Sequence, residues 1–158
     1  MQPKAPFTIR PATNADRDAI VAVVFGVLAE YGLSPDPATT DADLNDIERA
    51  YRANGGMFDV LLGPDGAIIG TVGLFPMGEG TVELRKMYLL SSQRGQGLGR
   101  RMLDHALDQA RALGFSRVTL ETASVLKEAV ALYERYGFKP YTPDHLAQRC
   151  DQAYRLEL

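Results

Sequence analysis

The sequence has few of the features that mark secreted, membrane-spanning or metal-binding proteins. A single cysteine, Cys150, excludes an internal disulfide and is typical of a reducing compartment. The longest apolar run, residues 19–29, is too short to cross a bilayer, and residues 1–7 lack the pattern of a signal peptide. Two histidines and one cysteine, at no recognised spacing, do not predict a metal site. We therefore expect a cytoplasmic protein that uses neither a membrane nor a metal ion.

The sequence also lacks an excess of charge of one sign. Lysine and arginine number 17 against 20 aspartates and glutamates, a net charge of -3, which argues against a nucleic-acid partner. With 46% hydrophobic and 23% charged residues, the 158 residues suit one globular domain that buries roughly two-thirds of its unfolded surface. We predict a flexible tail over residues 1–6, where Pro3 and Pro6 lie, and a single domain over residues 7–158.

The hydrophobic period changes several times between the helical and the extended value. Helices are predicted over residues 15–31, 41–54, 97–113 and, after a cap at Ser124, up to residue 136. Strands are predicted over residues 7–10, 57–62, 67–76, 81–90, 117–121, 138–141 and 153–158. Short turns join the three consecutive strands before residue 90, so this part of the sheet should be antiparallel. We predict an α+β or mixed α/β fold in which about four helices flank a central, twisted and mostly antiparallel sheet.

One glycine-rich segment, residues 94–101 (RGQGLGRR), follows a predicted strand and opens a predicted helix. Glycines at alternate positions let backbone N–H groups turn toward one point, and a helix N-terminus adds unpaired donors and the positive end of a dipole. Such a segment predicts an anion site, and phosphate is the commonest anion to occupy one. Arg94, Arg100 and Arg101 would crowd the first turn of this helix, a cost that a bound polyanion would reverse.

The segment differs from two familiar phosphate-binding motifs. A P-loop, G-x-x-x-x-G-K-[ST], is absent. The dinucleotide motif G-x-G-x-x-G is matched by Gly95 and Gly97 but not by Arg100, and Glu121 lies near the place of a ribose-binding acid. Only one further strand–helix unit follows, which is too little for a doubly wound sheet. A dinucleotide-binding (NAD-type) module is therefore the second hypothesis.

The same segment resembles the [R/Q]-x-x-G-x-[G/A] motif of the GNAT-superfamily N-acetyltransferases, with Arg94, Gly97 and Gly99 at its fixed positions. Residues 83–89 (ELRKMYL) look like that family's fourth strand, and residues 129–138 (AVALYERYGF) are similar to its A-x-x-L-Y-x-x-x-G-F motif. The two motifs occur in order and at compatible spacing. The resemblance implies a single GNAT-like acyl-CoA N-acyltransferase domain with acetyl-CoA as cosubstrate.

The resemblance also implies which residues hold coenzyme A. The backbone of Met87 and Leu89 would pair with the pantetheine arm as an added strand, and amides from Gly95 to Arg100 would hold the pyrophosphate. The residues thus assigned to the cofactor are Met87, Tyr88, Leu89, Arg94, Gly95, Gln96, Gly97, Leu98, Gly99 and Arg100. Many members carry asparagine seven residues before the tyrosine of the second motif, where this sequence has Leu126.

Acetyl transfer to an amine has three chemical requirements. The ammonium, with a pKa of about 10.4, must lose a proton, the oxyanion must be stabilised by a preorganised N–H, and the thiolate must be protonated. The resemblance places Tyr133 near the thioester sulfur, and a phenol that stays protonated at neutral pH suits the last task. Its helical spacing equally fits a core residue. Glu83 and Glu121, on neighbouring predicted strands, are the candidate bases, with Glu83 slightly preferred, and burial would raise either pKa toward 7.

The sequence leaves the acceptor open between a small-molecule amine and a peptide amine. Direct transfer in a ternary complex is expected, because no histidine at a telling spacing would activate Cys150 as a nucleophile. Asp36, Asp41, Asp43 and Asp46 could attract a cationic amine, and a solvated helix start explains them equally well. The resemblance also allows a homodimer. A non-catalytic acyl-CoA sensor is the remaining alternative.

Overall fold

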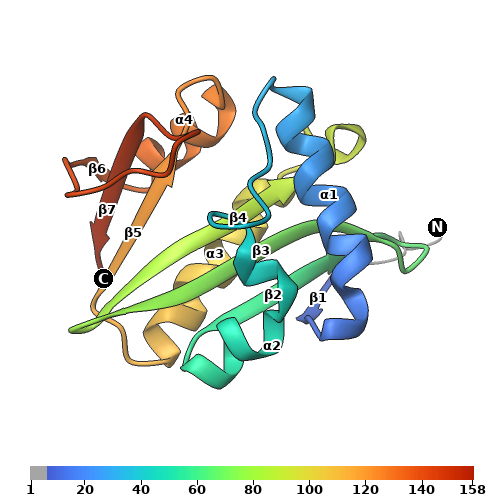
Figure 1. The fold of residues 1–158 in the computed structure, drawn as a ribbon, viewed down its shortest axis with the longest axis horizontal. Helices are drawn as coiled ribbons and strands as arrows, with labels where there is room; N and C mark the ends of the chain where they lie inside the picture. Colours follow the sequence, from blue (N-terminus) through green and yellow to red (C-terminus); the bar gives the residue numbers. More distant parts are fainter. Residues whose placement is uncertain (1–6) are drawn as a thin grey trace, which may run out of the picture.

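Seven strands form one mixed sheet in the computed structural model, which describes residues 7–158 (Figure 1). Side by side, the strands are β1 (Thr8–Pro11), β2 (Met57–Leu62), β3 (Ile68–Gly78), β4 (Thr81–Leu89), β5 (Arg117–Thr122), β7 (Gln152–Glu157) and β6 (Lys139–Pro140). Every neighbouring pair is antiparallel except β4 and β5, which are parallel. This confirms the predicted mixed, mostly antiparallel sheet. The tail predicted for residues 1–6 lies outside the described residues.

Helices cover both faces of the sheet (Figure 1). Helices α1 (Arg17–Glu30) and α2 (Ile47–Ala50) lie on what we call the α1 face, and α3 (Leu98–Ala112) and α4 (Lys127–Arg135) lie on the α3 face. The core on the α1 face contains Ile20, Val24, Leu28, Tyr51, Phe58 and Val60. The core on the α3 face contains Leu84, Leu103, Leu107, Val118, Leu120 and Tyr133. Among the helices of residues 7–158, none has the length and hydropathy needed to cross a membrane.

Alternation along β4 and β5 decides which side chains reach each face. Leu84 of β4 and Leu120 of β5 enter the core on the α3 face. Their neighbours Glu83 and Thr119, which pair with each other across the two strands, therefore lie on the α1 face. Glu83, Thr119 and Glu121 thus share one face, close to the point where the strands begin to separate.

The predicted helix over residues 41–54 is wrong as a continuous element. The segment forms a 3₁₀ turn at Ala42–Asn45, the single α-helical turn of α2 and a second 3₁₀ turn at Arg52–Asn54. Asp46 interrupts it with φ -148° and ψ 82°, and its carboxylate accepts from the Arg49 N–H at 3.2 Å. Aspartate competes in this way with helical hydrogen bonds, so local capping overrides the helical spacing of the apolar residues.

The predicted cap at Ser124 is also wrong. Helix α4 begins at Lys127 with Leu126 as its N-cap. The Ser124 N–H and hydroxyl instead donate to the two carboxylate oxygens of Asp151, at 2.7 and 2.6 Å. This tertiary contact ties the segment before α4 to the residue before β7.

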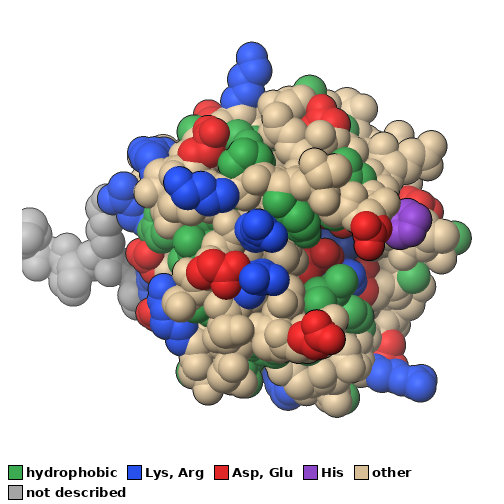
Figure 2. Space-filling model, turned by 90° about the vertical axis from the view of Figure 1, so that its left-hand side faces the viewer, with side chains coloured by type: hydrophobic (Ala, Val, Ile, Leu, Met, Phe, Trp, Pro, Cys, Tyr) green, Lys and Arg blue, Asp and Glu red, His purple; other side chains and the backbone are tan. Residues whose placement is uncertain are grey.

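The surface carries charges of both signs. Figure 2 shows basic and acidic side chains intermixed on one face of the molecule, and Arg117–Glu157 is an exposed ion pair of 2.6 Å. Exposed pairs of this kind contribute little stability because water and salt screen them. The intermixed surface agrees with the nearly balanced charge of the sequence.

Replacing Gly26 by alanine is expected to stabilise the protein. Gly26 lies inside α1 and an added Cβ would meet nothing within 4 Å, so the methyl group is accommodated while the unfolded chain loses freedom. The expected gain is about 0.5–1 kcal/mol, or roughly 2–3 °C in Tm, measured by thermal denaturation. Gly56→Ala is the matched control, because its Cβ would lie 2.0 Å from the Leu74 carbonyl oxygen and must destabilise the fold. A Tm unchanged or lowered by Gly26→Ala would contradict the prediction.

Candidate active site

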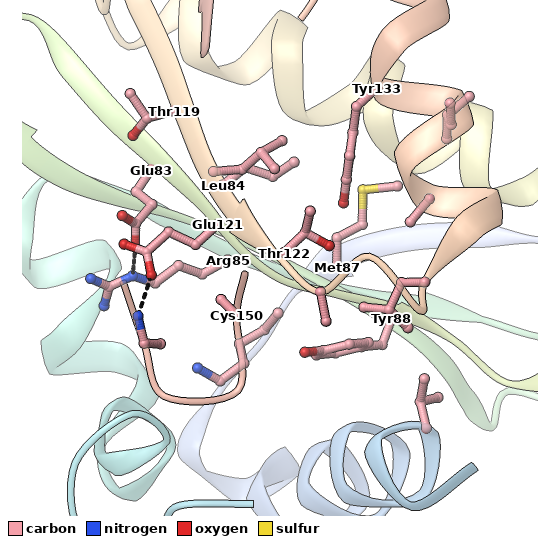
Figure 3. A pocket seen from close by; sticks show the side chains of 18 of the residues that line it. Glu83, Leu84, Arg85, Met87, Tyr88, Thr119, Glu121, Thr122, Tyr133 and Cys150 are labelled. Atoms are coloured by element: carbon pink, nitrogen blue, oxygen red, sulfur yellow. Dashed lines mark hydrogen bonds and ion pairs between the residues drawn. The ribbon is translucent and has the colours of Figure 1, made fainter. Parts of the chain in front are cut away.

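The parallel strands β4 and β5 separate soon after they meet. Their pairing begins at Thr81 and Arg117 and ends at Glu83 and Thr119, with none along the rest of these two described strands. The wedge between them opens into a cavity of ≈ 960 Å³ (Figure 3). Its walls come from β4, β5, α4, the end of α1, the turn before α3 and residues 141–150. Both motifs singled out in the sequence therefore reach the same space.

A β-bulge at Lys86 changes the direction of the side chains in β4. The register with β3 shifts between Thr71 and Gly73, and Lys86 has a left-handed φ of 53°. Because the bulge interrupts the alternation, the consecutive side chains of Arg85 and Lys86 both reach the α1 face, whereas Met87 packs against the core on the α3 face. Regular period-2 alternation along the sequence would have placed Lys86 in the core.

The bulge also turns backbone groups toward the cavity. Thr71 Oγ1 donates to the Lys86 carbonyl at 2.6 Å, so this carbonyl points toward β3. The following peptide bond is trans, which directs the Met87 N–H the opposite way, into the gap between β4 and β5. Farther along, the Leu90 N–H donates to β3 at 3.0 Å, so the N–H and carbonyl of Leu89 also face the gap. The edge of β4 thus offers the N–H groups of Met87 and Leu89 to a ligand, whereas the Leu89 carbonyl accepts from Arg94 Nη2 at 2.8 Å.

The glycine-rich turn lies in the cavity wall where α3 begins. Gly95 and Gly97 have φ values of 82° and 79°, and a Cβ added at either would meet nothing within 4 Å. The backbone conformation, rather than crowding, therefore requires glycine there. Gly97 is the N-cap of α3, and the first helical bond is made by the Arg101 N–H at 3.1 Å. The N–H groups of residues 98–100 thus have no partner within the helix and can bind an anion.

Most of the residues that the resemblance assigns to the cofactor lie around the cavity. Those that line it are Met87, Tyr88, Leu89, Arg94, Gly95, Gly97, Leu98, Gly99 and Arg100. Gln96 does not line it, and its side chain donates to the Gln93 carbonyl at 3.1 Å. Tyr88 packs beside the core on the α1 face, where burial raises its pKa to about 12.

Arg94 does not crowd the first turn of α3, so that expectation is wrong. Its backbone is extended ahead of the turn, and its guanidinium faces α1. Nη2 lies 3.0 Å from Glu30 Oε1 and 2.8 Å from the Leu89 carbonyl, while Nη1 lies 3.1 Å from the Tyr31 hydroxyl. Glu30 thus balances the charge of Arg94, and the side chain fixes the turn between α1 and the end of β4.

Tyr133 places a phenol in the cavity wall. Its ring is buried against Phe138, with 5.7 Å between ring centroids, and the hydroxyl points toward Thr122 and Met87 (Figure 3). Within residues 7–158 this hydroxyl has no hydrogen-bond partner, so it is free to act on a ligand. Burial, and to a smaller extent Tyr88, raises the pKa of Tyr133, which keeps it a proton donor at neutral pH.

The two candidate bases lie together where the strands separate, but their surroundings differ (Figure 3). Glu83 Oε1 accepts from Arg85 Nε at 2.5 Å. Glu121 Oε1 accepts only a neutral N–H, that of Ala147 at 2.7 Å, and no Lys, Arg or His among the described residues forms an ion pair with it. Burial raises the pKa of Glu121 and the negative charge of Glu83 adds to this shift, while the Ala147 N–H and the positive charge of Arg85 oppose it.

A buried network of charges supports the floor of the site, and the sequence analysis missed it. Lys86 Nζ lies 3.2 Å from carboxylate oxygens of both Asp41 and Asp43, and Arg149 binds Asp41 through two bonds of 2.7 and 2.8 Å. Although burial alone would raise the pKa of Asp41, the bonds from Arg149 and the Asp36 N–H and the charge of Lys86 hold it at about 2. These aspartates are therefore occupied by internal cations rather than available to a cationic amine.

Two other residues named from the sequence also line the cavity. Burial raises the pKa of the Cys150 thiol to about 11, so it stays protonated and unreactive at neutral pH. Leu126, at the family's asparagine position, presents an apolar side chain at the start of α4. Neither residue adds a polar group that could take part in acetyl transfer.

Comparison with known proteins agrees with the resemblance found in the sequence. Residues 25–138 match the model of the acetyltransferase (GNAT) family. The chain is 40% identical over 142 residues to an uncharacterized N-acetyltransferase of Escherichia coli. The aligned region covers 87% of this chain and 84% of the relative. It is 30% identical over 129 residues to an uncharacterized N-acetyltransferase of Schizosaccharomyces pombe, and this aligned region covers 81% of this chain and 79% of the relative.

Solved structures share the fold. An acetyltransferase of the GNAT family from Staphylococcus aureus has a TM-score of 0.90 at 19% identity, covering 96% of this chain and 99% of that chain. A GNAT-superfamily phosphinothricin acetyltransferase from Sinorhizobium meliloti, solved in complex with acetyl-CoA, has a TM-score of 0.75 at 21% identity, covering 96% and 88%. These matches decide against a dinucleotide-binding module.

Proposed function

Because the chain belongs to the acetyltransferase (GNAT) family and is an N-acetyltransferase that uses acetyl-CoA, we propose that it transfers the acetyl group directly to a primary amine in a ternary complex. The observation that carries this proposal is the continuity of the cavity. One space joins the turn at residues 95–100, the open edge of β4, the Tyr133 hydroxyl and the Glu121 carboxylate. Cofactor and acceptor can therefore meet without a covalent enzyme intermediate.

The cofactor is assigned to the backbone groups that the sheet and α3 leave unpaired. The N–H groups of residues 95–100 bind the pyrophosphate, aided by the positive end of the α3 dipole. The carbonyl of Met87 and the N–H of Leu89 pair with the pantetheine arm as an added strand would. Arg94 acts as a positioning residue, because its side chain holds the Leu89 carbonyl and the turn in place.

We assign the general base to Glu121 rather than to Glu83. Glu83 is already neutralised by Arg85 at 2.5 Å, whereas Glu121 faces the cavity without a cationic partner among the described residues. The raised pKa of Glu121 brings it closer to neutral pH, as base catalysis requires. Glu83 then serves to hold Arg85 in place.

The proposed reaction balances in four proton transfers. The substrate ammonium gives a proton to Glu121, and the freed amine attacks the thioester carbon while the Met87 N–H donates to the developing oxyanion. The C–S bond breaks, and Tyr133 gives its proton to the leaving thiolate. The acetylated nitrogen returns a proton to the Tyr133 oxygen, and Glu121 releases its own to solvent. Both side chains thus return to their starting states.

Ligand-induced thermal stabilisation tests the cofactor assignment. Acetyl-CoA or CoA at about a hundredfold over Kd should stabilise the protein by about 2.7 kcal/mol, which raises Tm by roughly 5–10 °C. NAD and NADP at matched concentrations serve as controls and should leave Tm unchanged, because the sheet offers no dinucleotide site. A shift with NAD or NADP alone would overturn the proposal, whereas a shift with acetyl-CoA would justify measuring CoA release with amines.

A further inference from the structure

The acceptor end of the cavity holds three charged side chains from two strands. Glu83 and Arg85 of β4 and Glu121 of β5 converge on the α1 face, where the strands have separated (Figure 3). Arg85 is held rigidly, because its Nε is bonded to Glu83 and its guanidinium carbon lies 3.9 Å from the centroid of the Phe75 ring. Its side chain is 27% exposed and lines the cavity. A fixed, planar cation is therefore presented to whatever enters this end.

The Nη1 and Nη2 groups of Arg85 form no hydrogen bond to a carboxylate among the described residues, and the polar group beside them is the neutral Tyr51 hydroxyl. No second carboxylate lies within ion-pair distance of Arg85 in the part of the chain that the structure describes. Two further cations of the cavity are already paired, since Lys86 lies against Asp41 and Asp43 and Arg149 lies against Asp41. Arg85 is thus a cation at the acceptor end of the cavity that can bind an anion through two parallel N–H bonds.

Glu121 is the complementary case, an acid without a cationic partner. It accepts only the Ala147 N–H, which leaves a second oxygen for a ligand. An occupant that suits both residues must carry an ammonium for Glu121 and, a short distance away, a planar anion for Arg85. A free amino acid has this pattern, since one carbon separates its ammonium from its carboxylate.

We propose that the acceptor is a free α-amino acid, with its ammonium against Glu121 and its carboxylate on Nη1 and Nη2 of Arg85. This inference rests on the proposed N-acetyltransferase function and narrows its acceptor. A polyamine would place a second cation against Arg85, and a peptide amine would leave the guanidinium without a carboxylate. The assignment makes Arg85 the residue that distinguishes free amino acids from other amines.

Acceptor discrimination by the wild-type enzyme tests the inference without a mutation. CoA release is measured with the common L-amino acids, with their carboxamides and with the corresponding decarboxylated amines. For the best amino acid, kcat/KM should exceed that of its carboxamide by about 10- to 100-fold, the range expected when a charged hydrogen-bond partner is removed. Turnover of amides, polyamines or peptides without turnover of free amino acids would overturn the inference and leave the acetyltransferase function standing.

The variant Arg85→Gln tests whether Arg85 causes the preference for an amino acid over its carboxamide. It should lower the preference for the amino acid over its carboxamide to about one, with the KM for acetyl-CoA unchanged. Arg155→Gln is the matched control, because Arg155 is an exposed arginine beside the Tyr141 ring and does not line the cavity. A preference retained in Arg85→Gln would contradict the inference. Absence of acetyl-CoA binding in the wild type would instead contradict the proposed function itself.

Discussion

The variant Tyr133→Phe is expected to turn over at least about 100-fold more slowly than the wild type while binding acetyl-CoA equally well. The phenol is the one proton donor that we place at the thioester sulfur, and its raised pKa keeps it protonated at neutral pH. Phenylalanine retains the packing against Phe138 and loses only the hydroxyl, which has no bond to any described residue. The fold and the cofactor site should therefore be intact, and the loss should appear in kcat rather than in KM.

Steady-state CoA release and the thermal shift with acetyl-CoA together check this prediction. Tyr136→Phe is the matched control, because Tyr136 follows the same helix but its hydroxyl is bonded to Asp104 at 2.6 Å, outside the cavity. Its turnover should match the wild type. An unchanged kcat in Tyr133→Phe would remove the assigned role of the phenol. A wild-type protein that binds acetyl-CoA but releases no CoA with any amine would favour the acyl-CoA sensor.

The parts of the site that could be predicted from the sequence depend on local backbone conformation. Gly95 and Gly97 adopt left-handed φ values in the turn into α3, a conformation that glycine adopts without steric cost. Gly137 likewise ends α4 with φ 92°, and the Phe138 N–H that follows bonds back to the Tyr133 carbonyl at 3.1 Å. The second motif is thus a helix end that sets the Tyr133 ring against Phe138.

The parts that could not be predicted depend on contacts between distant segments. Asp41 and Arg149 are 108 positions apart, and nothing in either neighbourhood indicates their pairing. The direction of Arg94 is decided by Glu30, which lies 64 positions away. The bulge at Lys86 reverses the face of every following side chain in β4, and the break in apolar alternation between Leu84 and Met87 does not by itself identify a bulge. For the same reason the preference for Glu83 as base was based on alternation alone and overlooked its ion pair with Arg85.

Replacing Lys86 by methionine is expected to lower the free energy of unfolding by about 3–5 kcal/mol, or roughly 10 °C in Tm. The Lys86 side chain is 4% exposed, and its ammonium is shared by Asp41, Asp43 and the Thr40 carbonyl at 3.1 Å. Methionine fills the same volume but leaves one buried negative charge uncompensated. Because Lys86 also forms the bulge that directs the Met87 N–H, kcat at a temperature where the variant is folded should fall as well.

Charge rescue distinguishes this account from a simple packing defect. The double variant Lys86→Met/Asp43→Asn removes one charge of each sign, so it should recover part of the stability that the single variant loses. Lys139→Met, which changes an exposed lysine on β6, is the matched control and should leave both Tm and kcat unaltered. If the losses of the two single variants simply added in the double variant, so that Asp43→Asn destabilised Lys86→Met as much as it destabilises the wild type, the network would not act as a unit. The bulge would then be held by the backbone alone, through the Thr71 bond to the Lys86 carbonyl.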